Sequence, residues 1–113
     1  MPEMFKFEQP QRYVTVEAGS SATIFELIVP SGHIAYIESI GNNWFANTYY
    51  TWTIDDETVE AKIERSIGTT SHPKYYKPPI TAKYKIKFVA HNNDSVSHTF
   101  EIVCDGYFQR EGE

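Results

Sequence analysis

The sequence predicts an all-β protein: an antiparallel β-sandwich of seven to eight strands, with a jelly roll as the favoured form. Alternation of apolar and polar residues with a period of two recurs along the chain, whereas no segment keeps a helical period for three turns. The alternating runs are short, and turn residues separate them at regular intervals, as in sandwiches and barrels. Aromatic residues make up 15% of the chain, and aromatic side chains favour strands.

The chain has 113 residues, a length that favours one domain able to bury about two thirds of its unfolded surface. We expect an extended N-terminal arm over 1–11, a single sandwich domain over 12–108 and a polar C-terminal tail over 109–113. The formal net charge of −5 argues against broad binding to nucleic acids or anionic membranes, which need a basic surface. No apolar run approaches the roughly 18 residues of a transmembrane helix, and the N-terminus lacks the apolar segment of a signal peptide.

The first eleven residues contain two prolines and no clear alternation, which is why we interpret them as an arm. The arm either reaches a neighbouring subunit or is a loose terminus. Three strands are expected next, at 12–17, 22–29 and 34–40. Each alternates and ends at a turn signal, namely AGSS, PSG and GNN in that order.

Two further strands are expected at 47–54 and 58–64, on either side of Asp55 and Asp56. The stretch 68–79 contains three prolines and is interpreted as a long connection, with an eighth strand if part of it pairs. Proline cannot donate to a sheet ladder, so the segment SHPKYYKPPI (71–80) should follow a sheet edge or cross one end of the sandwich. There it either binds a partner or covers an edge against aggregation.

The last two strands, 81–90 and 98–108, are predicted to form an antiparallel hairpin centred on Asp94. One register places apolar residues on one side and charged residues on the other, and a slip by one residue would mix them. The expected apolar pairs are Phe88 with Phe100, Ile86 with Ile102, and Tyr84 with Cys104. The expected ion pairs on the solvated side are Lys87 with Glu101 and Lys83 with Asp105. Cys104, the only cysteine, is then a buried apolar residue rather than a nucleophile, and no intrachain disulfide can form.

Within the connection HNNDSVSHTF, three residues could hold zinc: His91, Asp94 and His98. Their spacing matches no standard zinc module, and the Asn, Asp and Ser residues between them are those that a turn requires. The structural loop is therefore the favoured interpretation.

The acidic corner 55–57 offers oxygen ligands for calcium but lacks the spacing of a dedicated calcium loop, so a two-residue hairpin turn is favoured there. No nucleophile elbow, phosphate-binding loop, metalloprotease motif or dinucleotide-binding turn is present in the sequence. The sequence therefore predicts no enzyme, no cofactor and no metal.

The aromatic segment 44–52 is the best candidate for ligand binding. Alternation places Tyr50, Trp52 and Ile54 toward the core, which leaves Tyr49 and Trp44 outside. Exposed rings of this kind could stack on sugars. The favoured interpretation is that the segment belongs to the core or to a subunit interface, because Tyr and Trp are also favoured in protein interfaces.

Several stretches together resemble a known group of proteins. These stretches are VPSGHIAYIESIG, TWTIDDE, IGTTSHPKYYKPPI and KIKFVAHNNDSVSHTFEIVCDGYF. As a set, over about residues 27–108, they resemble small all-β proteins of tailed phages and related proviruses that act as virion accessory or capsid-decoration proteins. Asp56 departs from the pattern, where a glycine would make a tighter turn.

The resemblance implies a non-enzymatic structural protein of a bacteriophage particle, located in the virion and assembled in the host cytoplasm. It implies a homo-oligomer, with a trimer favoured, that binds the major capsid protein or another virion protein and neither nucleic acid nor membrane. The expected interface residues are Phe5, Phe7, Trp44, Tyr49, Tyr75 and Tyr76. The alternatives are a carbohydrate-binding β-sandwich module built on Trp44 or Tyr49, and a metal-dependent enzyme built on His91, Asp94 and His98.

Overall fold

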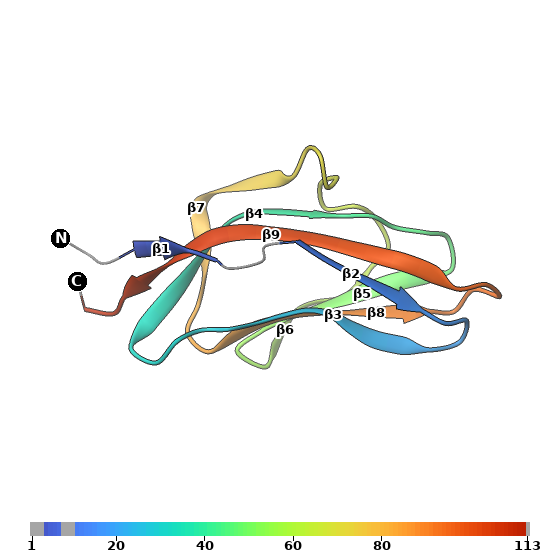
Figure 1. The fold of residues 1–113 in the computed structure, drawn as a ribbon, viewed down its shortest axis with the longest axis horizontal. Coiled ribbons are helices and arrows are strands. Elements are labelled where there is room, and N and C mark those ends of the chain that lie inside the picture. The colour runs from blue at the N-terminus through green and yellow to red at the C-terminus, as the bar shows by residue number, and fades with distance from the viewer. Residues whose placement is uncertain (1–3, 8–10, 113) are drawn as a thin grey trace.

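The computed structural model describes residues 4–7 and 11–112, and in these residues the fold is an antiparallel β-sandwich without helices (Figure 1). The predicted fold class is thus confirmed. The strands are β1 (Met4–Lys6), β2 (Gln11–Val16), β3 (Ser21–Ile28), β4 (His33–Asn42), β5 (Thr48–Ile54), β6 (Glu57–Ile63), β7 (Lys74–Ala82), β8 (Lys85–Asn92) and β9 (His98–Arg110). The domain is elongated, with principal extents of 51 × 26 × 21 Å.

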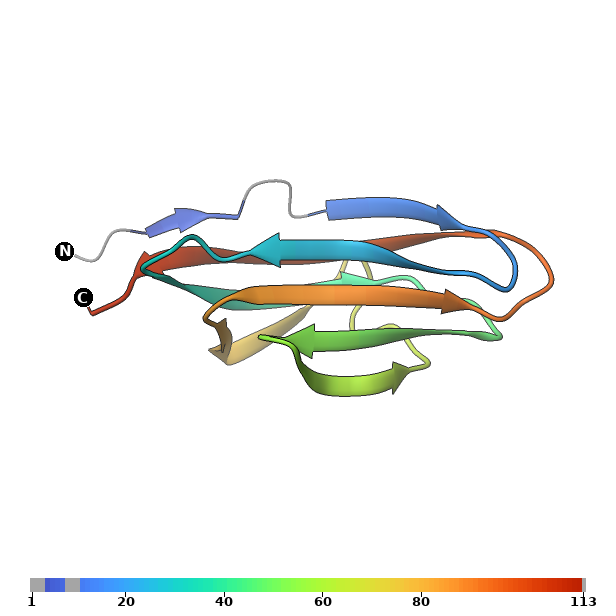
Figure 2. The same ribbon diagram turned by 90° about the horizontal axis from the view of Figure 1, so that it is seen from below.

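The strands form two sheets that pack face to face. Sheet A has the order β1-β9-β4-β7. β2 also pairs with β9: β1 pairs with residues 107–109 of that strand and β2 with residues 98–103. Sheet B has the order β3-β8-β5-β6. Figure 2 looks onto sheet B, with β9, β4 and β7 of sheet A behind it.

The pairing of the strands is nested. The innermost pair is the hairpin of β5 and β6, and around it β4 pairs with β7, β3 with β8, and β2 with β9. Apart from the β5–β6 hairpin, every connection from β2 to β9 passes from one sheet to the other. The jelly-roll form remains a prediction.

The core lies between the sheets and is made by the predicted alternation. In β8 the buried residues are Ile86, Phe88, Ala90 and Asn92, and in β9 they are Phe100, Ile102, Cys104, Gly106 and Phe108. Tyr50 and Trp52 of β5 join them, with the Trp52 ring stacked on Phe88 at a centroid distance of 5.3 Å. The prediction that Cys104 is a buried residue is confirmed.

The predicted hairpin of the last two strands is wrong. β8 pairs with β3 and β5 in sheet B, whereas β9 pairs with β2, β1 and β4 in sheet A. Two strands with matching apolar sides can pair edge to edge, or they can face each other across a core, and alternation alone fits both. Lys87 therefore lies opposite Glu26 and Thr53, not Glu101. Tyr84 precedes β8 and is exposed rather than opposite Cys104.

The proline-rich stretch contains the eighth strand that the sequence left open. Residues 81–82, expected in the following strand, belong to β7, which forms an edge of sheet A next to β4. An edge position suits Pro78 and Pro79, which have no N–H to donate to a second neighbour. The preceding residues 68–73 form the connection from β6.

The chain ends differ from the expected arm and tail. Met4–Lys6 pairs with β9 of the same chain, and Phe7 is buried against Phe108 and Gly106. Residues 1–3 and 8–10 of the expected arm lie outside the described residues, as does Glu113 of the expected tail. β9 continues to Arg110, so the first two residues of that tail belong to the sheet.

Candidate binding surfaces

The three candidate zinc ligands do not form one cluster: Asp94 and His98 lie together, and His91 lies elsewhere. The Nε2 atom of His98 lies 2.8 Å from Oδ2 of Asp94, and the His98 ring stacks on Phe45. The hydrogen bond from His98 is the main cause that lowers the pKa of Asp94. In the part of the chain that the structure describes, no group of three His, Cys, Asp or Glu residues could hold a metal ion.

His91 lies on the outer side of sheet B and belongs to a different network. Its Nδ1 atom is 2.8 Å from the Ser21 hydroxyl and its Nε2 atom is 2.9 Å from the Thr51 hydroxyl. The Tyr49 ring stacks on the imidazole at a centroid distance of 4.4 Å, and the Lys62 amine lies over that tyrosine. Burial lowers the pKa of His91. These contacts tie three strands of sheet B together.

Two buried asparagines, which the sequence analysis did not single out, hold the loops at one end of the sandwich. The Asn92 amide donates to the carbonyls of Val16 and Val96, and its oxygen accepts from the Asp94 N–H. Asn42 bonds in the same way to the backbone of Asn43, Arg65 and Ile67. Fully bonded buried amides of this kind fix loop geometry. The HNND stretch therefore anchors a loop.

The acidic corner is a two-residue hairpin turn, as favoured from the sequence. Asp55 and Asp56 have φ angles of 52° and 64°, and Ile54 pairs with Glu57. The Asp55 carboxylate accepts hydrogen bonds from the backbone N–H groups of Lys83, Tyr84 and Lys85. The Asp55 carboxylate, a candidate calcium ligand, thus joins the β5–β6 turn to residues 83–85.

The six expected interface residues are dispersed. Three are exposed: Phe5 at 41%, Trp44 at 38% and Tyr75 at 69%. Phe5 and Trp44 come from opposite ends of the sandwich, and Tyr75 lies on β7 (Figure 1). The other three are Phe7, which is buried, Tyr49, which stacks on His91, and Tyr76, which packs partly against the core. Trp44 also donates its indole N–H to the Thr48 carbonyl at 2.9 Å.

The outer side of sheet A carries four tyrosines, which we call the tyrosine face: Tyr13, Tyr36, Tyr75 and Tyr107. Directly opposed residues share one side of a sheet, and Tyr36 lies opposite Tyr107, with the two rings stacked at 5.1 Å. Tyr13 and Tyr75 are more than 60% exposed. Sequence reasoning found only Tyr75. The signal for the others was available, because each alternates with residues that face the core.

Charged groups border the tyrosine face. Lys6 pairs with Glu38 at 2.7 Å and also lies over the Tyr107 ring. Glu101 and Asp105 of β9 are on the same side, since they lie opposite Tyr13 and Ser39. The face is therefore aromatic with an acidic excess.

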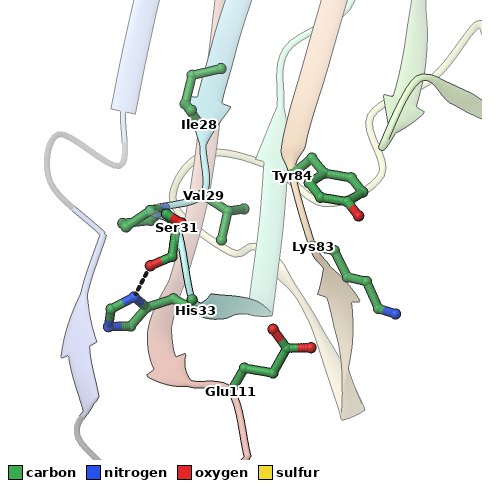
Figure 3. Close-up of a pocket in the computed structure, with 9 residues that line it drawn as sticks. Ile28, Val29, Ser31, His33, Lys83, Tyr84 and Glu111 are labelled. Carbon is green, nitrogen blue, oxygen red and sulfur yellow. Dashed lines mark hydrogen bonds between the residues drawn. The ribbon is translucent and has the colours of Figure 1, made fainter.

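A cavity of about 430 Å³ opens at the end of the sandwich where β9 finishes. It is lined by residues 28–33, which include the β3–β4 turn and His33, by the corner between β7 and β8 (83–84), and by Glu111. Figure 3 shows Tyr84 and Lys83 on one side, Ser31 and His33 on the other, and the Glu111 carboxylate directed toward Val29. No residue of this cavity was singled out from the sequence as a binding residue.

Comparisons of the sequence with protein-family profiles and with curated proteins find no match. Within the described residues no helix is long and apolar enough to cross a membrane.

Proposed function

We propose that this chain is a non-enzymatic structural protein of a viral particle, where it decorates and stabilises the capsid by binding the major capsid protein or another shell protein. The resemblance of residues 27–108 to phage decoration proteins supports the viral setting. The observation that carries the binding role is the tyrosine face, in which Tyr13 and Tyr75 expose large rings on one side of sheet A.

The chemistry of the tyrosine face suits a protein partner. Tyrosine supplies apolar contact area and a hydroxyl with few rotatable bonds, and it is enriched in protein interfaces. Glu101 and Asp105 would meet Lys or Arg residues of the shell, which would fix the register of binding. Binding should therefore weaken as the salt concentration rises.

The sheet edges support a closed oligomer rather than open growth. The prolines of β7 and the charged side chains of β6 disfavour edge-to-edge addition of strands. A trimer that buries the exposed Met4 and Phe5 of β1 would leave no complementary surface free, so no further subunit could add. The nested pairing of β2 to β9 supports the jelly-roll form, which consists of two Greek keys. In this proposal the chain acts in the virion, is assembled in the host cytoplasm and binds neither nucleic acid nor membrane.

Co-sedimentation with particles tests the proposal. Particles of the virus or provirus that encodes the chain are stripped of it and mixed with the purified protein. We expect saturable binding, and the double variant Tyr13→Ser, Tyr75→Ser should bind at least roughly tenfold more weakly, a loss of about 1.4 kcal/mol. Tyr84→Ser is the matched control, since Tyr84 is as exposed as Tyr75 but lies outside sheet A. Absence of binding by the unmodified chain would refute the proposal.

A further inference from the structure

The cavity at the end of the sandwich has the size and rigidity of a small-molecule site. Its volume of about 430 Å³ lies within the range of ligand pockets. The Val29 N–H donates to the Tyr84 carbonyl at 2.9 Å, and the Glu111 N–H donates to the Gly32 carbonyl at 2.8 Å. The Asp55 carboxylate accepts a hydrogen bond from the Tyr84 N–H at 2.6 Å. Three separate segments are thus joined before any ligand arrives, which lowers the cost of ordering them on binding.

The side chains around the cavity combine apolar, aromatic and oppositely charged groups. Val29 and Pro30 supply apolar surface, and the Tyr84 ring is 70% exposed. The Lys83 amine is a donor, and the Glu111 carboxylate accepts hydrogen bonds and extends into the opening in Figure 3. Among the residues that the structure describes, neither Lys83 nor Glu111 forms an ion pair. The charge of Lys83 also helps to lower the pKa of the nearby Asp55 carboxylate.

This combination selects the class of ligand. One cation and one anion give the cavity no net charge, which disfavours phosphates and divalent cations. A neutral ligand that carries several hydroxyls can donate to Glu111 and accept from Lys83 at the same time. A ligand with an apolar side can also cover the exposed Tyr84 ring and remove it from water. A saccharide ring has both properties.

We propose that the cavity formed by the β3–β4 turn, the 83–84 corner and Glu111 binds a saccharide unit, with the sugar ring on Tyr84 and its hydroxyls on Lys83 and Glu111. The site is separate from the tyrosine face, because Tyr84 and the β3–β4 turn lie outside sheet A. The proposal does not rest on the role in a viral particle, and the two can fail independently.

Titrations followed by ¹H–¹⁵N correlation NMR test this site. The probes are methyl glycosides of glucose, galactose, mannose and N-acetylglucosamine, with maltose and lactose. We expect at least one probe to shift the amide signals of Gly32, Tyr84 and Glu111, with a roughly millimolar Kd. Tyr84→Ala should raise that Kd roughly tenfold, whereas Tyr75→Ala, the matched control with 69% exposure, should leave it unchanged.

Three results would overturn the assignment: shifts confined to other parts of the protein, no response to any probe, or an unchanged Kd in Tyr84→Ala. Glycine and glutamate serve as zwitterionic probes. If they shift the three amide signals and the sugars do not, the cavity is an amino-acid site and the saccharide proposal is wrong. Amide shifts away from the cavity in the Tyr84→Ala protein report whether the variant keeps its fold.

Discussion

The carboxylate of Asp55 accepts a 2.6 Å hydrogen bond from the backbone N–H of Tyr84. It also accepts from the N–H groups of Lys83 and Lys85 at 2.9 and 3.0 Å. Successive backbone donors around one anion are a common way to hold negative charge. Here the anion is part of the protein, and it joins the β5–β6 turn to the corner between β7 and β8. The same contact supports one wall of the end cavity.

Asp55→Asn should lower the free energy of unfolding by about 1–2 kcal/mol, because an amide replaces the charged acceptor of three backbone donors. Chemical denaturation measures this. Asp56→Asn is the matched control: it makes the same substitution at the next left-handed residue, and its cost should stay below about 0.5 kcal/mol. Among the described residues, Asp56 forms one ion pair, with Lys85 at 3.0 Å, and it lies at the surface. Equal costs for the two variants would contradict a special role for Asp55.

The stability of the fold should fall as the pH is lowered below about 6.5, and His91 is one cause. Burial lowers the pKa of His91, so the unfolded chain binds a proton more readily than the folded protein does. Neutral His91 therefore contributes fully to the free energy of unfolding above pH 6.5. This contribution is lost as the pH falls through the lower pKa that His91 has in the folded protein. Denaturation between pH 7.5 and 4.5 measures this. His91→Gln should show a smaller decline, and an identical decline would exclude His91 as its source.

A similar loss is expected at lower pH for Asp55. Burial, the largest single influence, raises the pKa of Asp55, but the bonds from Lys83, Lys85 and Tyr84 together lower it below the ordinary 3.8. The ionised Asp55 carboxylate thus stabilises the fold fully above pH 3.8. This stabilisation disappears as the pH falls through the lower pKa that Asp55 has in the folded protein. In Asp55→Asn the acid branch of the stability curve should be shallower than in the parent protein.

Gly106→Ala should destabilise the protein by about 3 kcal/mol, since a methyl group there would meet the Tyr36 carbonyl oxygen and the Phe7 ring. Gly19→Ala is the comparison, because the space around Gly19 is open and only its φ of 73° opposes alanine. Its cost should be about 1 kcal/mol. Thermal and chemical denaturation of both variants measure the difference. Similar costs would mean that Gly106 does not lie as close to the Tyr36 carbonyl of β4 and to the Phe7 ring as the structure has it.

Cys104 should resist thiol reagents in the folded protein. Burial and, to a smaller degree, the charge of Asp105 raise the pKa of its thiol, so little thiolate is present near neutral pH. A colorimetric thiol assay should detect the cysteine only after a denaturant is added. Rapid labelling of the native protein would show that this part of β9 opens readily.

The sequence predicts the strands well because buried apolar and exposed polar residues alternate within each strand. The expected strands at 12–17, 22–29, 34–40, 47–54 and 58–64 match β2 to β6 within one or two residues. Pairing is a non-local property that alternation does not specify. Phe88 and Phe100 both face the core, but whether they meet within a sheet or across the sandwich depends on the strands that lie between them.

The candidate surfaces were less predictable than the fold. Tyr75 could be identified because it stands in a proline-rich segment, whereas Tyr13 and Tyr107 join it only once β2, β9 and β7 are placed in the same sheet. The cavity brings together Val29, Tyr84 and Glu111, which are far apart in the sequence. Tyr84 was also assigned to the core because the predicted strand began before β8 does. The local pattern of residues does not predict contacts between segments that are distant in the sequence.

Cross-linking mass spectrometry of purified particles tests the central claim most directly. Under the proposed function, the particles are those of the virus or provirus that would encode this chain, and a lysine-reactive reagent is used. We expect the chain at a fixed ratio to the shell protein, with cross-links to that shell from Lys6, beside the tyrosine face, and none from Lys87 on the outer side of sheet B. Particles that lack the chain, or shell cross-links that come from Lys87 alone, would contradict the account.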